Sequence, residues 1–152
     1  MQGKQFNELF RITTKTLLYR YVNGGGGQID LVAPSGKSHT YRFEIPIDGE
    51  FPPSVRFVHA MHGKRKFYIG MMEDGAFRLT RHSHFNEDTE IVRGAKYIVS
   101  RLDDSQPESL EDCQMKMYHN GRCARCGRRL WNSRQCGEGM GRKCLQKFRS
   151  KS

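Results

Sequence analysis

The five cysteines of this chain all lie between residues 113 and 144, and their spacing is typical of a metal site. Cys123 and Cys126 form a Cys-x2-Cys pair that is followed by Gly127. In such a pair the turn directs two sulfur atoms at one point, and the glycine permits the tight backbone that follows. Cys144 opens residues 144–148, which we expect to form a short helix whose N-terminal dipole stabilises a thiolate. The pattern therefore predicts a metal ion bound by these three cysteines.

Two residues compete for the position of the fourth ligand. Cys136 would complete a closed site of four thiolates, whereas His119 would complete a site of three cysteines and one histidine. Both ligand sets are common for structural zinc, so we expect one structural Zn²⁺ per chain. A closed zinc site has no open position for water, and no serine–histidine–aspartate, paired-carboxylate or phosphate-loop pattern stands out in the chain. We therefore expect the protein not to be an enzyme.

The net charge of +10 lies entirely in the same part of the chain. Residues 1–113 hold 15 basic and 15 acidic side chains, whereas residues 114–152 hold 11 basic ones and a single acid, Glu138. Such a concentration of one sign on a small module favours a phosphate polymer, DNA or RNA, as the partner. The candidate phosphate contacts are Arg122, Arg125, Arg128, Arg129, Arg134, Arg142, Lys143 and Lys147. Such contacts position a nucleic acid without specifying its sequence, so we expect non-specific, salt-dependent binding.

The motif extends on both sides of the cysteine pair. From His119 to Leu130 it is His-x-Gly-Arg-Cys-x-Arg-Cys-Gly-Arg-x-Leu, and from Gly139 to Cys144 it is Gly-x-Gly-x2-Cys. This pattern resembles an uncharacterised family of zinc modules found mostly in bacteriophage and mobile-element proteins. That family has a histidine matching His119 and tends to be aliphatic where this chain has Cys136. The resemblance is specific for residues 118–152, and it implies a phage or mobile-element origin but no established activity.

A second hypothesis belongs to a different class of protein. A basic module can imitate or block nucleic-acid contacts on an acidic partner. The resemblance therefore also fits a phage-encoded interaction protein that redirects or inhibits a host protein, such as a defence or transcription component. Trp131 bears on this choice, because beside Arg128 and Arg129 it would either stack on a base or cover the core of the module.

Composition also restricts where the protein works. Five cysteines without a secretory signal indicate a reducing compartment, which we expect to be the cytoplasm, that of the host cell if the protein is phage-encoded. No apolar run approaches the roughly 20 residues that a membrane-spanning helix needs. We therefore expect no membrane association.

The remainder of the chain must position this module. Alternating and continuous apolar patterns predict strands at residues 29–33, 40–45, 55–61, 66–72 and 76–80. A continuous apolar stripe predicts a helix at residues 91–102, capped by Asn86 or Asp88. The four glycines at residues 24–27 suggest a hinge or loop, since neither helices nor strands favour them.

These patterns predict an α+β fold with three parts along the chain. Residues 1–105 should form an antiparallel sheet of four to five strands with one or two helices. Residues 106–117 are rich in acids and should form a linker and lead-in. Residues 118–152 should form a basic zinc-binding module of the treble-clef or zinc-ribbon kind, which is too small to fold without its metal.

Overall fold

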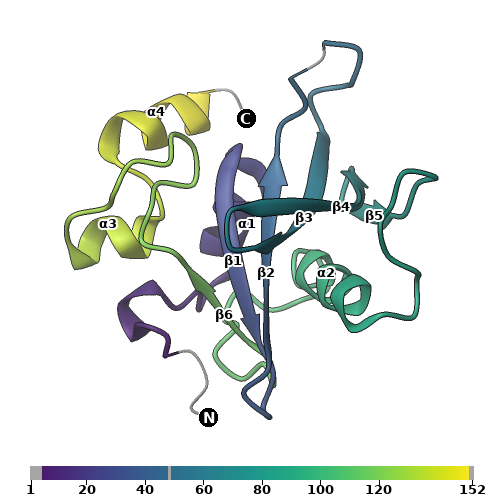
Figure 1. Cartoon of the computed structure of the whole chain (residues 1–152). Helices are drawn as coiled ribbons and strands as arrows, with labels where there is room; N and C mark the ends of the chain where they lie inside the picture. Colours follow the sequence, from purple (N-terminus) through teal and green to yellow (C-terminus); the bar gives the residue numbers. More distant parts are fainter. Residues whose placement is uncertain (1–4, 48, 151–152) are drawn as a thin grey trace.

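The computed structural model of the chain describes residues 5–47 and 49–150 and has an α+β fold with one antiparallel sheet (Figure 1). The strands are β1 (Gly26–Val32), β2 (Ser38–Glu44), β3 (Val55–His62), β4 (Arg65–Glu73), β5 (Ala76–Arg78) and β6 (Lys116–His119). Their order in the sheet is β5-β4-β3-β2-β1-β6. The α+β class is thus confirmed, but the expected count of four to five strands is wrong, because the described residues form six.

The additional strand spans the expected boundary between the linker and lead-in (residues 106–117) and the module (residues 118–152). β6 pairs with β1 in antiparallel register, with Ile29 opposite His119 and Leu31 opposite Met117. β6 has only four residues, which is too short for an alternating pattern to stand out in the sequence. Its partner β1 lies about 90 residues earlier in the chain, so the pairing is long-range and no local pattern indicates it.

The two helices of residues 1–105 begin at side-chain caps. The threonine hydroxyls of Thr14 and Thr89 accept hydrogen bonds from backbone N–H groups at the starts of α1 (Lys15–Asn23) and α2 (Glu90–Ser100). The expected cap of the second helix, Asn86 or Asp88, is therefore wrong. Thr89 takes this role because its own extended backbone directs its hydroxyl at Val92 N. The apolar stripe of α2 is confirmed, with Val92, Ala95, Ile98 and Val99 all buried.

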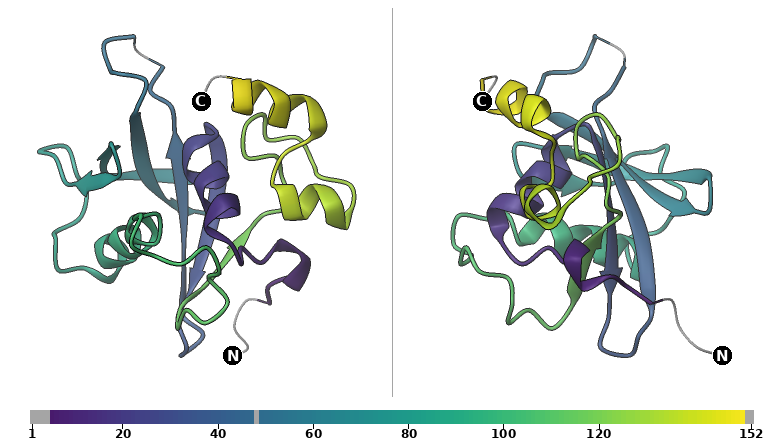
Figure 2. Two further views of the ribbon diagram at one scale, coloured as in Figure 1. Left: turned by 180° about the vertical axis from the view of Figure 1, so that it is seen from behind. Right: turned by 90° about the vertical axis from the view of Figure 1, so that its left-hand side faces the viewer.

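Both helices cover the same face of the sheet, which Figure 2 shows from behind. A side-chain carbon at Gly27 of β1 would overlap the carbonyl oxygen of Tyr21 in α1. On α2, a carbon at Gly94 would meet the side chains of Leu31 and Tyr41. Gly27, Leu31 and Tyr41 point to one face, since residues two apart in a strand and residues directly opposite share a face. The Tyr41 hydroxyl donates to the carbonyl oxygen of Ile91 at 2.7 Å, which fixes α2 against β2.

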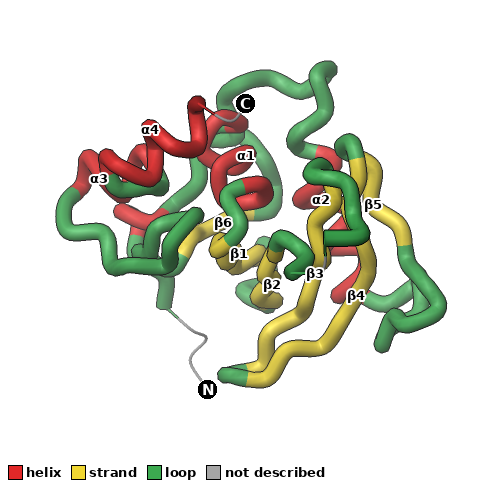
Figure 3. The backbone as a smooth tube through the Cα atoms, turned by 90° about the horizontal axis from the view of Figure 1, so that it is seen from above, coloured by secondary structure: helices red, strands yellow, loops and turns green. Residues whose placement is uncertain are grey.

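Residues 118–150 lie at the β6 edge of the sheet beside α1, as Figures 1 and 3 both show. They contain a reverse turn at residues 121–130, here called the knuckle, followed by the short helices α3 (Ser133–Glu138) and α4 (Arg142–Ser150). A 3-10 helix, η1 (Glu8–Phe10), packs against α3 and β6. The expected helix that begins near Cys144 is confirmed as part of α4.

The run of four glycines is not the expected loop. Gly26 and Gly27 already belong to β1, and Gly24 caps the end of α1. A side-chain carbon at Gly24 would lie 2.5 Å from the carbonyl oxygen of Ala124, and one at Gly26 would lie 2.9 Å from that of Arg125. The Gly26 N–H also donates to the Ala124 carbonyl at 2.8 Å. The glycines therefore let the knuckle backbone lie directly on the junction of α1 and β1.

A single buried cluster joins the sheet and the module. From residues 106–150 it includes Leu110, Met117, Cys123, Ala124, Leu130, Cys136, Met140 and Leu145, and these share it with residues of α1, α2 and the sheet. The division at residues 105 and 118 stays a prediction about separate folding. The shared core and the pairing of β6 with β1 are reasons to expect one folding unit instead.

We predict that Gly27→Ala destabilises the protein by about 3 kcal/mol, because its new methyl group would overlap the backbone of α1. Urea unfolding of the two proteins measures the difference in free energy of unfolding. The matched control is Gly137→Ala in α3, where a side-chain carbon meets nothing within 4 Å and the exchange should be neutral or stabilise by up to about 1 kcal/mol. Equal small effects at both positions would contradict the close approach at residue 27.

Candidate metal centre

Three of the cysteines converge at the contact between the knuckle and α4. The sulfur atoms of Cys123, Cys126 and Cys144 all lie within 4.8 Å of one another. Three sulfurs at the corners of a tetrahedron around Zn²⁺ would be about 3.8 Å apart, since each Zn–S bond is about 2.3 Å long. The cluster therefore fits a metal ion. Cys123 is buried, Cys144 is half-buried and Cys126 is exposed, so the group opens to solvent on the Cys126 side.

The local backbone explains how the two knuckle sulfurs face one point. The Cys123 N–H donates to the Arg128 carbonyl at 2.7 Å, and the Gly127 N–H donates back to the Cys123 carbonyl at 3.0 Å. These bonds close a tight reversal, and Gly127 has a φ of 77°, a left-handed conformation that favours glycine. Arg122 and Arg129 pair across the start of the turn as an antiparallel bridge. Gly127 thus has the role that its position after the cysteine pair predicts.

Hydrogen bonds prepare Cys123 for the thiolate form. Burial acts to raise its pKa, but backbone N–H donors from Cys126, Arg125 and Gly141 act together against burial and lower it. Burial raises the pKa of Cys144, and the neighbouring Cys126 thiol acts in the same direction. Several thiolates so close together repel one another, and a bound cation would relieve this repulsion.

The structure does not bring either candidate for the fourth ligand into this group. His119 lies at the end of β6 with both ring nitrogens in hydrogen bonds: Nδ1 accepts from the Gly121 N–H at 3.0 Å, and Nε2 donates to the Cys136 carbonyl at 2.9 Å. Its ring stacks on Tyr21 with centroids 4.6 Å apart. Burial lowers the His119 pKa to about 4, although the bond to the Cys136 carbonyl acts to raise it. His119 is therefore a neutral histidine of the core.

Cys136 is likewise part of the core. It lies in the middle of α3 with 4 % of its surface exposed, and burial raises the pKa of its thiol. Cys113 is half-buried and packs against the same core from residues 106–117. Of the five candidate metal ligands, the structure therefore groups three, whereas His119 and Cys136 are buried outside this group.

The eight candidate phosphate contacts do not have the same surroundings. Seven are exposed: Arg122, Arg128, Arg129, Arg134, Arg142, Lys143 and Lys147. Arg125 is half-buried, and its Nη1 lies 3.9 Å from the sulfur of Cys144. The only acid of residues 114–152, Glu138, lies 3.4 Å from Arg134 in the i,i+4 arrangement. Arg149, in the last turn of α4, is also exposed and was not among the candidates.

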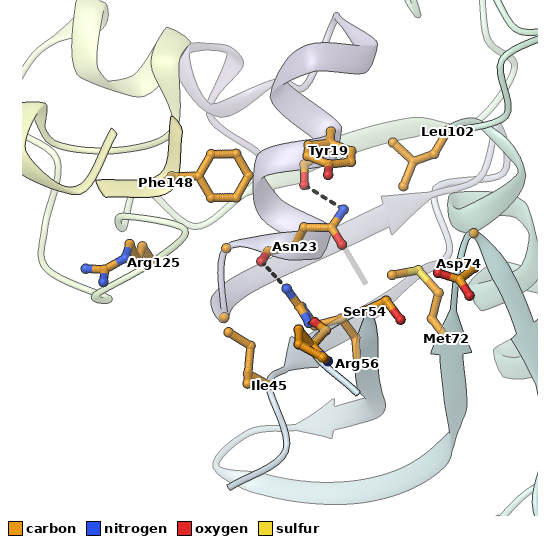
Figure 4. Close-up of a pocket in the computed structure, with 14 residues that line it drawn as sticks. Tyr19, Asn23, Ile45, Ser54, Arg56, Met72, Asp74, Leu102, Arg125 and Phe148 are labelled. Atoms are coloured by element: carbon orange, nitrogen blue, oxygen red, sulfur yellow. Dashed lines mark hydrogen bonds between the residues drawn. The ribbon is translucent and has the colours of Figure 1, made fainter. Parts of the chain in front are cut away.

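Arg125 also borders a cavity of about 800 Å³ between the module and the sheet (Figure 4). Tyr19 and Phe148 line it with their rings 6.0 Å apart, and Arg56 lies on the opposite wall. The Arg56 guanidinium donates to the carbonyl oxygens of Asn23, Pro53 and Val55 at 2.7–2.9 Å. Arg56 thus holds the β3 end of the cavity to the end of α1, although its buried Nε has no hydrogen-bond partner among the described residues.

Helix α1 packs against the module, a contact that no pattern in its own sequence indicates. The Tyr21 hydroxyl donates to the Arg122 carbonyl at 2.7 Å, and Arg20 Nη1 donates to the Glu138 carbonyl at 2.9 Å. A side-chain carbon at Gly139, which ends α3, would lie 2.7 Å from the Leu17 side chain. These partners are more than 100 residues apart, so only the four-glycine run could have signalled a close contact.

Comparisons with known proteins give no relative for this chain. No family model, curated protein or solved structure matches it. The resemblance of residues 118–152 to a phage zinc module therefore stays a hypothesis. Within residues 5–47 and 49–150, none of the helices combines the length and apolar character needed to cross a membrane.

We predict that the purified protein contains one metal ion per chain and that Cys123→Ser or Cys126→Ser releases it, because each change removes one of three clustered ligands. Elemental analysis measures the metal content. Cys136→Ser and the control Cys113→Ser should keep the ion, since both sulfurs lie outside the cluster. Loss of the ion from a folded Cys136→Ser variant would identify Cys136 as a ligand.

We also predict that His119 makes the folded protein less stable as the pH falls. Between pH 6.5 and about 4 the unfolded chain binds a proton at His119 while the folded chain does not, so stability is lost as the pH falls through this window. The full effect is roughly 3 kcal/mol at 1.36 kcal/mol per pKa unit. His119→Gln retains one donor and one acceptor and should lose this part of the pH dependence in urea unfolding. Identical pH profiles would contradict a buried neutral His119.

Proposed function

We propose that this protein binds nucleic acid, mainly through phosphate contacts of the basic module at residues 118–152. The observation that supports this most directly is the exposure of seven of the eight candidate cations on a module with a single acid. Isolated surface charges are common, but a concentrated field of one sign attracts a polyanion and speeds its association. The partner is DNA or RNA, because both carry the same phosphate groups.

The knuckle makes its charges effective by holding them on a fixed backbone. Arg128 and Arg129 follow shortly after the cysteine pair, and the Arg128 carbonyl oxygen accepts a hydrogen bond from the Cys123 N–H. Arg122 lies opposite Arg129 in the bridge, and its Nη1 donates to the Gly127 carbonyl at 3.2 Å. A rigid base reduces the conformational entropy that binding must remove.

We further propose that the metal is a single structural zinc held by Cys123, Cys126, Cys144 and a fourth ligand that closes the site. Thiolate-rich sites favour zinc, and zinc would cross-link the knuckle to α4. The cations on both elements would then keep fixed positions relative to one another. The role is binding rather than catalysis, and the phage-type origin rests on the motif between His119 and Cys144.

We predict that log affinity for nucleic acid falls linearly with log salt concentration, because each phosphate contact releases counterions. Arg128→Ala/Arg129→Ala should weaken binding to all sequences alike. On duplex DNA it should reduce the size of the salt slope by about 1.8, which corresponds to two contacts at about 0.9 each. Fluorescence anisotropy with labelled DNA and RNA at several salt concentrations measures both quantities.

The matched control is Lys64→Ala/Arg65→Ala, at the turn after β3 and the first residue of β4. This pair is also exposed, adjacent and partly stacked, since Arg65 lies 5.3 Å from the centre of the Phe67 ring. It belongs to the electrically balanced part of the chain, so its loss should leave affinity and slope nearly unchanged. A flat titration of the unaltered protein at low salt would contradict the proposal and favour the alternative, a protein that binds a host protein.

A further inference from the structure

The single tryptophan of the chain lies on the outside of the basic module. Trp131 is 77 % exposed, although a tryptophan usually buries most of its large apolar surface. The hypothesis that it covers the core of the module is therefore wrong, and Leu130, its buried neighbour, takes that position. An exposed tryptophan contributes little to folding, and its large ring is available for contact with a ligand.

The backbone around Trp131 is held in place although its side chain is exposed. The Trp131 N–H donates to Gln135 Oε1 at 2.7 Å, and the Gln135 N–H donates to Asn132 Oδ1 at 2.9 Å. The second bond is the N-cap of α3, and the first ties the residue before the cap to the first turn of the helix. On the other side, the Leu130 N–H donates to the Gly121 carbonyl at 2.8 Å and continues the knuckle. Trp131 therefore extends from a fixed point between the knuckle and α3.

The charges around this ring suit a polyanion. The Arg129 guanidinium lies 5.4 Å from the centre of the Trp131 ring, within the range of a cation–π contact. Arg128 and Arg134 are exposed on the adjoining residues of the knuckle and α3. One ring with arginines on both sides in sequence combines a stacking surface with phosphate contacts, which is the pairing that single-strand binding proteins use.

We propose that Trp131 stacks on an unpaired base, so that the module binds single-stranded nucleic acid in preference to duplex. The proposal rests on the proposed function and names its substrate class. Bases within a duplex are covered on both faces by their neighbours, whereas an unpaired base offers a free face to an aromatic ring. The neighbouring arginines contact phosphates of either form, and only the ring distinguishes them.

Because Trp131 is the only tryptophan, its fluorescence tests the proposal directly. The metal-bound full-length protein is titrated with a single-stranded oligonucleotide and with the matching duplex, and tryptophan emission and anisotropy of a labelled strand are both recorded. We expect quenching by the single strand and little change with duplex. Trp131→Leu should weaken single-strand binding about tenfold, in the range of one lost stacking contact, and change duplex binding little.

Two further variants control for the effect of the substitution itself. Trp131→Phe keeps an aromatic face and should retain most of the affinity. Phe51→Leu removes another exposed aromatic ring, outside the module, and should change nothing. We expect each variant to fold because both side chains are exposed, and circular dichroism checks this.

The failures of the two proposals are distinguishable. If no nucleic acid binds at low salt, or if the emission responds only to lipid vesicles or to a protein, both proposals are overturned. If binding depends on Arg128 and Arg129 but Trp131→Leu leaves it unchanged, the basic module still binds nucleic acid and base stacking is overturned. Equal weakening of single-strand and duplex binding by Trp131→Leu overturns the preference for single strands.

Discussion

The fold of this protein depends on the close approach of two backbones, that of the four-glycine run and that of the knuckle. Gly24 and Gly26 lie against the carbonyl oxygens of Ala124 and Arg125, at distances that leave no room for a side chain. The Gly26 N–H donates to the Ala124 carbonyl, so the contact also satisfies buried polar groups. A side chain at either glycine would separate the module from the sheet.

This contact places the candidate metal site and the neighbouring cations beside α1 and the sheet. Tyr21 meets the strand at Gly27, stacks on His119 and donates to the Arg122 carbonyl. Tyr21 thus contacts the sheet through its backbone, and β6 and the knuckle through its buried side chain. Cys123 belongs to the knuckle, so the metal cluster and the cations that follow it are positioned relative to the sheet. A module that moved freely on a linker would present its charges with a larger loss of entropy on binding.

The sequence was informative where the pattern is local. Strands β1 to β5 and helix α2 follow from apolar periodicity, because one face of each is buried against the same core. The three clustered cysteines follow from the geometry of a Cys-x2-Cys turn. The sheet edge β6 and the packing of Gly24 and Gly26 depend on partners about 90 to 100 residues away, which no local pattern specifies.

The two candidates for the fourth ligand lie outside the sulfur cluster for a common physical reason. His119 and Cys136 have the residue types of metal ligands, but types do not reveal burial or the hydrogen bonds that a side chain already makes. Both nitrogens of His119 are used by backbone groups of Gly121 and Cys136, and this arrangement exists only after β6 and α3 have packed together. The exposure of Trp131 depends in the same way on Leu130 filling the core.

We expect the sheet and the basic module to form one cooperative unit. Native-state hydrogen exchange at increasing denaturant tests it residue by residue. The amides of Ile29 and Leu31 in β1 report on the sheet, and those of Cys123, Ala124 and Leu130 report on the knuckle, where each donates to a backbone carbonyl. We predict that both sets exchange with the same free energy of opening. Exchange of the knuckle amides at a much lower free energy, with the sheet still protected, would contradict the claim.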